Sequence, residues 1–254
     1  MRTGNTLQTL IASLATYGPR PAIVALSKAA LQTWSYAQLA DQVLRLAAGL
    51  GEAGVGPGDP VVMFAENSPE WMMAALAVVA AGAVVTPVDA QFGDELLGHI
   101  LADSGARWIF TTADQTQRLA ALALDHRLQL ILLDAAADDR QSWRQLLAAE
   151  CHALPVPTLG ATATLFYTSG TTGRPKGVPL SHTNLVFQIE TVIQARIVGD
   201  TDRVLLPLPL HHVYPFVMGM LAPLALGLPI ILPQALTGPQ IVRALREGEV
   251  TLMI

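Results

Sequence analysis

The 254-residue sequence contains one cysteine and two lysines, and it carries a formal net charge of −5. Cys151 cannot form an intrachain disulfide, and Arg2, Asn5 and Gln8 stand where a secretion signal needs an uninterrupted apolar run. We therefore expect a cytoplasmic protein. The negative charge balance provides no basic patch for nucleic acid and no polybasic membrane anchor, so nucleic-acid binding is not expected.

No Asp, Glu, Lys or Arg occurs between residues 204 and 242, and the mean hydropathy of the chain is +0.42. A transmembrane helix needs about 20 apolar residues. This stretch, however, contains seven prolines together with His211 and His212, and each proline removes a backbone donor and distorts a helix. Buried strands and short helices are predicted there, and weak peripheral contact with a membrane stays open as an alternative.

Apolar runs and helix-start signals alternate through the middle of the chain. Ser68, Pro69 and Glu70 supply an N-cap, a proline for the first helical position and an acid for the first turn. Such alternation predicts an α/β fold with a parallel, doubly wound sheet. The predicted strands are 61–65, 83–88, 107–111, 129–133 and 163–167, and the predicted helices are 71–81, 94–103 and 115–124.

The flanking segments show the same kind of alternation. Residues 138–160 interrupt it with a predicted charged helix and a Pro/Gly connection, after which Ser181 is expected to cap a helix that reaches about residue 197. The tail is expected to hold strands at 203–208, 230–232 and 250–254 and helices at 213–226 and 239–247. The first 58 residues are expected to hold a helix, strands at 22–26 and 32–35, and a long helix to about residue 53.

Residues 167–178 read YTSGTTGRPKGV, a segment rich in glycine and hydroxyl side chains. Its glycines let backbone amides approach an anion without a Cβ in the way, and Lys176 adds positive charge. The spacing excludes a Walker A loop, because Pro175 stands where that pattern has its second glycine and Gly177 follows the lysine. A polyphosphate-binding loop is predicted, at the carboxyl end of a parallel strand where ligands bind in open sheets. The alternative is a flexible surface loop.

This segment resembles the YTSGTTGxPKG signature of the adenylate-forming superfamily, which includes acyl-CoA synthetases, aryl-CoA ligases, firefly-type luciferases and peptide-synthetase adenylation domains. Trp34-Ser-Tyr-Ala-Gln-Leu39 is similar to that family's TYxEL box, and residues 81–89 are similar to its KAGAxxxPxD box. Both boxes are expected to be structural, with Asp89 bonding its own turn.

The resemblance also implies an architecture. It implies two adjacent αβα units of largely parallel sheet, as in the N-terminal domain of acyl-CoA synthetases, in incomplete form. Residues 59–198 would form one unit that ends in the phosphate-binding loop, while residues 1–58 and 199–254 would be two parts of the second. Since the enzymes of this superfamily are longer, the chain is expected to be the N-terminal part of a larger enzyme.

Residues 208–214, LPLHHVY, are similar to the PLFHxxG element of acyl- and aryl-CoA synthetases. By this resemblance His212 lies between the nucleotide and the acyl pocket and contacts the carboxylate or adenylate. His211 is expected to be a hydrogen-bonded core residue, and His182 and Arg174 are expected to be exposed. Tyr214 and Pro215 stand where the family has its usual glycine, which leaves the shape of the pocket open.

The missing charge in this region bears on the substrate. Peptide-synthetase domains place an Asp here to hold an α-amino group, and residues 204–242 contain none. An unpaired ammonium in an apolar site would cost several kcal/mol, so a non-amino carboxylic acid is favoured. Five side chains could line a tunnel for its tail or belong to the core of a helix: Val213, Tyr214, Phe216, Met218 and Met220.

The reaction implied by the resemblance is ATP-dependent activation of a fatty or aryl acid to an acyl-adenylate and then to an acyl-CoA thioester. Its cofactors would be ATP, Mg²⁺ and coenzyme A, and catalysis would rest on positioning and charge neutralisation. By the family pattern Thr168 contacts magnesium and His212 faces the acyl group. The phosphates would be held by Thr168, Ser169, Gly170, Thr171, Thr172, Gly173 and Lys176.

Two alternatives remain open at this point. The acceptor could be an acyl carrier protein in place of coenzyme A, or the chain could be a nucleotide-binding module without catalysis. The family's later motifs lie beyond residue 254, so this chain alone is expected to be inactive. The sequence does not indicate an oligomeric state.

Overall fold

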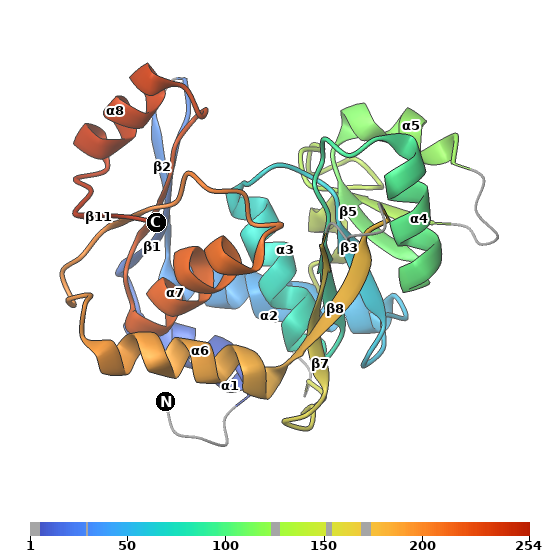
Figure 1. Ribbon diagram of the computed structural model, residues 1–254, viewed down its shortest axis with the longest axis horizontal. Coiled ribbons are helices and arrows are strands. Elements are labelled where there is room, and N and C mark those ends of the chain that lie inside the picture. The colour runs from blue at the N-terminus through green and yellow to red at the C-terminus, as the bar shows by residue number, and fades with distance from the viewer. Residues whose placement is uncertain (1–5, 29, 123–127, 151–153, 169–173) are drawn as a thin grey trace.

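The structure is a computed structural model, and it describes residues 6–28, 30–122, 128–150, 154–168 and 174–254. Figure 1 shows two sheets side by side, with helices between them and on the outer side of each. This arrangement confirms the predicted α/β class with two adjacent layered units of largely parallel sheet. The exact division at residues 58/59 and 198/199 stays a prediction.

One sheet has six strands in the order β6-β5-β3-β4-β7-β8. Its strands are β3 (Pro60–Met63), β4 (Val84–Pro87), β5 (Trp108–Thr111), β6 (Gln129–Leu132), β7 (Thr162–Thr168) and β8 (Lys176–Ser181). The first five pair in parallel, and β8 pairs antiparallel with β7. The helical elements that follow its strands are α3 (Pro69–Ala80), α4 (Asp94–Ser104), η2 (Ala113–Gln115) and α5 (Thr116–Ala120).

The other sheet has five strands in the order β11-β9-β10-β1-β2. Its strands are β1 (Pro21–Leu26), β2 (Leu31–Ser35), β9 (Val204–Leu205), β10 (Ile230–Leu232) and β11 (Leu252–Met253). Strand β1 pairs in parallel with β10, with Ile23 opposite Ile230, so the two ends of the chain build one sheet. The helical elements around it are α1 (Leu7–Ser13), η1 (Leu14–Tyr17), α2 (Tyr36–Glu52), α6 (His182–Ala195), η4 (Pro215–Leu221), α7 (Ala222–Leu226) and α8 (Gly238–Glu247).

The largest hydrophobic cluster joins both sheets through the helices between them. Helix α3 lies at its centre, and every residue of this helix except Glu70 is buried. Ser68 caps it by accepting from the amide of Trp71, as the sequence indicates. A helix that is apolar on nearly all sides must be covered on nearly all sides, and α1, α2, the six-stranded sheet and Phe216 of η4 cover α3. No helix in the described part of the chain is long and apolar enough to cross a membrane.

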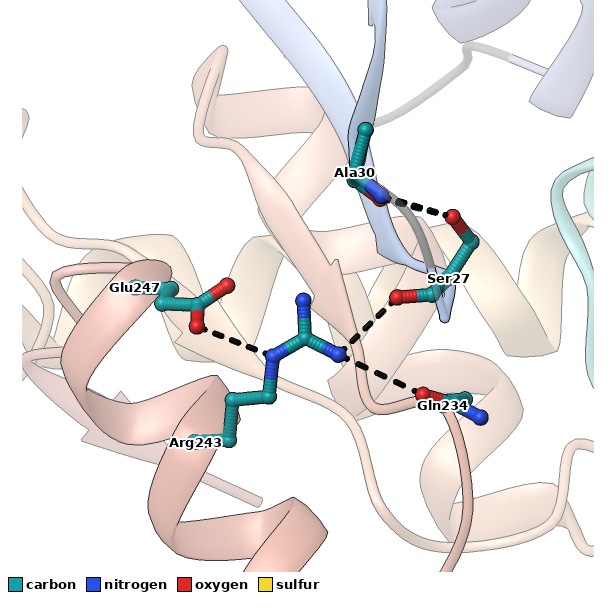
Figure 2. A network of polar contacts seen from close by, with 5 residues as sticks. All are labelled: Ser27, Ala30, Gln234, Arg243 and Glu247. Atoms are coloured by element: carbon teal, nitrogen blue, oxygen red, sulfur yellow. Dashed lines mark hydrogen bonds and ion pairs between the residues drawn. The ribbon is translucent and has the colours of Figure 1, made fainter.

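Helix α8 covers the outer face of the five-stranded sheet and is fastened to the β1–β2 turn, as Figure 2 shows. The Arg243 guanidinium donates to the carbonyl oxygen of Ser27 at 2.9 Å and to Gln234 Oε1 at 3.3 Å, while its Nε donates to Glu247 at 2.9 Å. The Ser27 hydroxyl in turn accepts from the amide of Ala30. These contacts link the first and last segments of the sheet.

Two elements differ from the sequence prediction. The prediction of a charged helix from residue 138 is wrong. Its described residues form only a short 3-10 helix, η3 (Trp143–Leu146), because this segment docks on α2 through its backbone. Arg45 Nε donates to the carbonyl oxygen of Ala148 at 2.8 Å, and the amide of Ala148 donates back to Arg45. Strand β8 was not predicted. It contains Pro179, which an edge strand of the described sheet tolerates.

Candidate functional site

The glycine-rich segment connects β7 and β8, which form an antiparallel hairpin. Thr168 pairs directly with Lys176, and Tyr167 pairs with Gly177. Both Thr168 and Lys176 are exposed, so a hydroxyl and an ammonium stand together at the neck of the hairpin. Strand β7 runs parallel to β4, which places this neck at the carboxyl edge of the sheet. The other predicted phosphate ligands, Ser169, Gly170, Thr171, Thr172 and Gly173, lie outside the described residues.

The histidine segment follows β9 and is held by a side chain from the other sheet. Asn67, which comes after β3, donates from Nδ2 to the carbonyl oxygen of Leu208 at 2.8 Å. Its Oδ1 accepts from the amide of Leu210 at 2.9 Å. One amide side chain therefore fixes the peptide immediately before His211. The sequence analysis missed Asn67, whose only signal was a polar residue shortly after a buried strand.

His211 and His212 lie against each other with their ring centroids 4.3 Å apart. His211 Nε2 is 3.7 Å from Asp89 Oδ2, at the end of β4, and 19% of the His211 side chain remains exposed. His211 is thus only partly a core residue, and His212 is exposed. Burial lowers the pKa of His211, and the nearby Asp89 carboxylate opposes that shift. Asp89 also accepts from the amide of Gln91 at 2.9 Å, which confirms that it bonds its own turn.

Buried aromatic rings connect the hairpin with the histidine segment. Phe166 on β7 meets Phe216 of η4 edge to face, with ring centroids 5.5 Å apart. Trp71 of α3 approaches the same ring at 6.3 Å. The amide of Phe216 donates to the carbonyl oxygen of His212 at 3.1 Å. Since Phe166 comes two residues before Thr168, one packed cluster supports both parts of the predicted site.

An apolar cavity of about 260 Å³ is lined by Tyr214, Met218 and Ile197 and by residues 252–254 at the end of the sequence. Among the five candidate tunnel residues, Tyr214 and Met218 line this cavity, whereas Phe216 and Met220 are fully buried in the core. The cavity is slightly smaller than the roughly 300–1,000 Å³ usual for small-molecule sites. It can take an apolar group of modest size.

A second cleft of about 320 Å³ separates the carboxyl ends of the two sheets. Its walls come from the segments after β3, β4, β9 and β10, and it shares Glu66, Asn67 and Gln91 with a polar hollow of about 600 Å³. In open parallel sheets ligands occupy such crevices beyond the strand ends. The hairpin neck and the histidine segment lie at this same edge.

His182 is not exposed, contrary to the prediction from the sequence. It is the first residue of α6, only 1% of it is accessible, and its Nδ1 accepts from the amide of Leu7 at 3.3 Å. Burial lowers its pKa. The sequence showed the cap at Ser181 but not the packing of α1 against the helix start. Arg174 is exposed, as expected.

The described residues contain no group of three or more His, Cys, Asp or Glu side chains arranged to hold a metal ion. Mg²⁺ commonly takes only one or two protein ligands and completes its shell with phosphate oxygens and water. The exposed Thr168 hydroxyl at the hairpin neck fits such a minimal role.

Comparison with known proteins shows the family. The model of the AMP-binding enzyme family matches residues 11–254, so the chain belongs to that family. It is 36% identical to a feruloyl-CoA synthase of Amycolatopsis over 221 residues, which cover 86% of this chain and 43% of that protein. It is 34% identical to a sulfoacetate–CoA ligase of Cupriavidus necator, covering 78% of this chain and 39% of that protein. The chain therefore spans less than half the length of these relatives.

Solved structures show the same fold. The N-terminal domain of FACL13 from Mycobacterium tuberculosis superposes with a TM-score of 0.85 at 24% identity, covering 98% of this chain and 62% of that chain. The o-succinylbenzoate CoA synthetase of Bacillus subtilis superposes with a TM-score of 0.78 at 23% identity, covering 98% of this chain and 62% of that chain. The predicted membership of the adenylate-forming superfamily and the predicted fold are confirmed.

Proposed function

We propose that the protein is part of an ATP-dependent ligase that activates a non-amino carboxylic acid and transfers the acyl group to coenzyme A. The relatives are CoA ligases, which supports this reaction class. The observation that carries the proposal is the aromatic cluster around Phe216, which joins the hairpin neck at Thr168 and Lys176 to the segment of His212. The groups proposed to bind phosphate and to face the acyl group would then belong to one site.

The proposed reaction has two steps. The substrate carboxylate attacks the α-phosphorus of ATP and pyrophosphate leaves, after which the thiol of coenzyme A attacks the acyl carbon and AMP leaves. Lys176 and the segment 169–173 would bind the β- and γ-phosphates and neutralise charge as pyrophosphate departs. His212 would contact the carboxylate or adenylate. Mg²⁺, held by Thr168 and phosphate oxygens, would add further charge neutralisation.

The substrate class follows from charge and space. Residues 204–242 offer no carboxylate for an ammonium group, so an amino acid would be poorly bound. The 260 Å³ cavity beside Tyr214 and Met218 is apolar and suits an aryl tail. Feruloyl-CoA synthase and 4-coumarate–CoA ligases among the relatives also support an aryl acid. A fatty acid of modest length is the second choice. A cytoplasmic location and peripheral membrane contact stay predictions.

A thioester assay of the complete ligase tests the proposal, with aryl acids and straight-chain acids of graded length as substrates. Lys176→Ala should lower the adenylation rate on the order of 10²-fold, as loss of one charge-stabilising donor does. Lys28→Ala is the matched control because Lys28 is the only other lysine and is exposed in the β1–β2 turn. Equal rates for the two variants would contradict the role of Lys176.

The same assay separates the two alternatives. Thioester formation only on an acyl carrier protein would identify that protein as the acceptor in place of coenzyme A. ATP binding without pyrophosphate exchange, with every acid tested, would favour a non-catalytic nucleotide-binding module. The isolated 254-residue chain should show no ATP–pyrophosphate exchange, and detectable exchange would contradict that expectation.

A further inference from the structure

Helix α4 contacts both sides of the hairpin neck. The Tyr167 hydroxyl, at the end of β7, donates to Asp103 Oδ2 at 2.7 Å. On the other side, His99 Nε2 lies 3.1 Å from the carbonyl oxygen of Pro175, immediately before β8. Since that oxygen can only accept, Nε2 is the donor. We call these two hydrogen bonds the α4 clasp.

The two clasp residues of the helix are suited to act together. His99 and Asp103 are four residues apart in α4 and therefore lie on the same face of the helix, one turn from each other. Their partners, Tyr167 and Pro175, directly precede Thr168 and Lys176. The clasp thus fixes the chain one residue before each of the two paired side chains that are predicted to bind phosphate.

Gly177 on β8 lies beside the Tyr167 ring of the clasp. A Cβ at Gly177 would lie 3.4 Å from Cζ and 3.5 Å from the hydroxyl oxygen of Tyr167, and 3.0 Å from Cδ1 of Leu165. The backbone of Gly177 does not have a positive φ, so conformation does not require glycine there. A Cβ at residue 177 would be in ordinary contact with the Tyr167 ring and would crowd only Leu165. Burial, reinforced by the bond to Asp103, raises the pKa of Tyr167, so its hydroxyl stays protonated and can donate.

We propose that His99 and Asp103 are positioning residues, which hold Thr168 and Lys176 at the spacing that triphosphate binding requires. This inference rests on the proposed function, because it assigns a purpose to the clasp only if the hairpin neck binds ATP. Glycine-rich chain loses much backbone freedom when it is ordered around a ligand. Fixing the neck before ATP arrives reduces that cost, and the benefit should appear as tighter ATP binding.

Three substitutions in the complete ligase test the clasp. Tyr167→Phe removes only the hydroxyl, and His99→Ala removes the other donor. Each should raise KM for ATP about threefold to tenfold, the effect of one lost hydrogen bond, and should leave KM for the acid unchanged. Asp103→Asn keeps an acceptor oxygen for Tyr167 and should stay within about twofold of the original enzyme.

Tyr17→Phe is the matched control. Its hydroxyl donates to the carbonyl oxygen of Ala225 at 2.6 Å, far from the hairpin in sequence, and is about as buried as that of Tyr167. A purely structural hydrogen bond would lower the melting temperature in both Tyr→Phe variants and leave KM for ATP unchanged in both. That result would overturn the clasp.

The outcomes also separate this inference from the proposed function. If the unmodified ligase turns over ATP and neither Tyr167→Phe nor His99→Ala changes KM for ATP, the clasp is wrong and the function stands. If the unmodified ligase neither binds nor consumes ATP, both are wrong. Should Tyr167→Phe fail to fold, the His99→Ala variant decides, since it leaves the Tyr167–Asp103 bond in place.

Discussion

The two sheets of this protein share one layer of helices but are built from the chain in opposite ways. The strands of the six-stranded sheet all lie between residues 60 and 181, and β3, β4 and β5 are each followed directly by their own helices. The five-stranded sheet combines strands from both ends of the chain, so that Ile23 pairs with Ile230. The first sheet is specified by local signals, whereas the second depends on contacts between distant segments.

Hydrogen bonds from tyrosine side chains join the distant segments that build the five-stranded sheet. We call these contacts joints. The Tyr36 hydroxyl donates to the carbonyl oxygen of Leu228 at 2.9 Å, and Tyr17 donates to Ala225, so the first segment is bonded to the chain around α7. The two tyrosine rings lie 4.9 Å apart. We therefore expect substitutions at such joints to lower the free energy of unfolding more than equivalent substitutions within the six-stranded unit.

The largest effect is expected at Gly49, where α2 passes over the segment of η3. A Cβ there would lie 1.6 Å from the carbonyl oxygen of Leu146, so Gly49→Ala must displace backbone and should destabilise the protein by about 3 kcal/mol or more. Gly51→Ala is the control in the same helix, with no atom within 4 Å of the added Cβ, and it should be neutral or stabilise by up to about 1 kcal/mol. Urea unfolding measures both. Similar urea midpoints for the two variants would contradict this prediction.

A second pair compares the two regions directly. Gly227 and Gly105 both end a helix with positive φ, of 72° and 65°. Gly105→Ala, in the six-stranded unit, meets no atom within 4 Å and should cost about 1–2 kcal/mol from backbone strain alone. Gly227→Ala places a Cβ 2.4 Å from the Tyr17 ring at the joint and should cost about 2 kcal/mol more. Equal thermal stability of the two variants would contradict this prediction, because it would mean that the Tyr17 ring moves aside at little cost in stability.

The smallest expected effect is on the pH dependence of stability. His182 is buried and neutral where α1 meets α6, and burial lowers its pKa from the ordinary 6.5. Between 6.5 and the lowered value the unfolded chain binds the proton and the folded chain does not. Stability should therefore be full above pH 6.5 and fall as the pH drops through that window, by at most about 1.4 kcal/mol per pH unit.

His182→Asn isolates that contribution, since the Asn Oδ1 can accept from the amide of Leu7 and does not titrate. The urea midpoint of this variant should change less between pH 7 and pH 5.5 than that of the original protein. The same loss of stability in both would assign the pH dependence to other groups.

Local signals predicted much of the fold. Ser68 and Ser181 both cap their helices in the structure, as predicted. The segment of η3 could not be predicted, since it is stabilised by docking on α2, which is distant in sequence. Local periodicity does not contain that information.

The candidate site divides in the same way. The composition of the hairpin segment pointed to Thr168 and Lys176, and the histidine motif pointed to His212. Asn67, His99 and Asp103 were missed because each contacts a partner that is far away in the chain, and two of the three contact backbone atoms. Every residue has a backbone carbonyl, so the sequence does not show which carbonyl a side chain will contact.

The almost completely buried helix α3 has a consequence during synthesis. Ala80 leaves the ribosome about 150 residues before Leu232, the end of the strand that pairs with β1. At about 5–20 residues per second, that delay is roughly 8–30 s. For most of this time the apolar helix lacks the cover that η4 supplies, where Phe216 packs against Trp71, and a nascent-chain chaperone has its best opportunity to bind there.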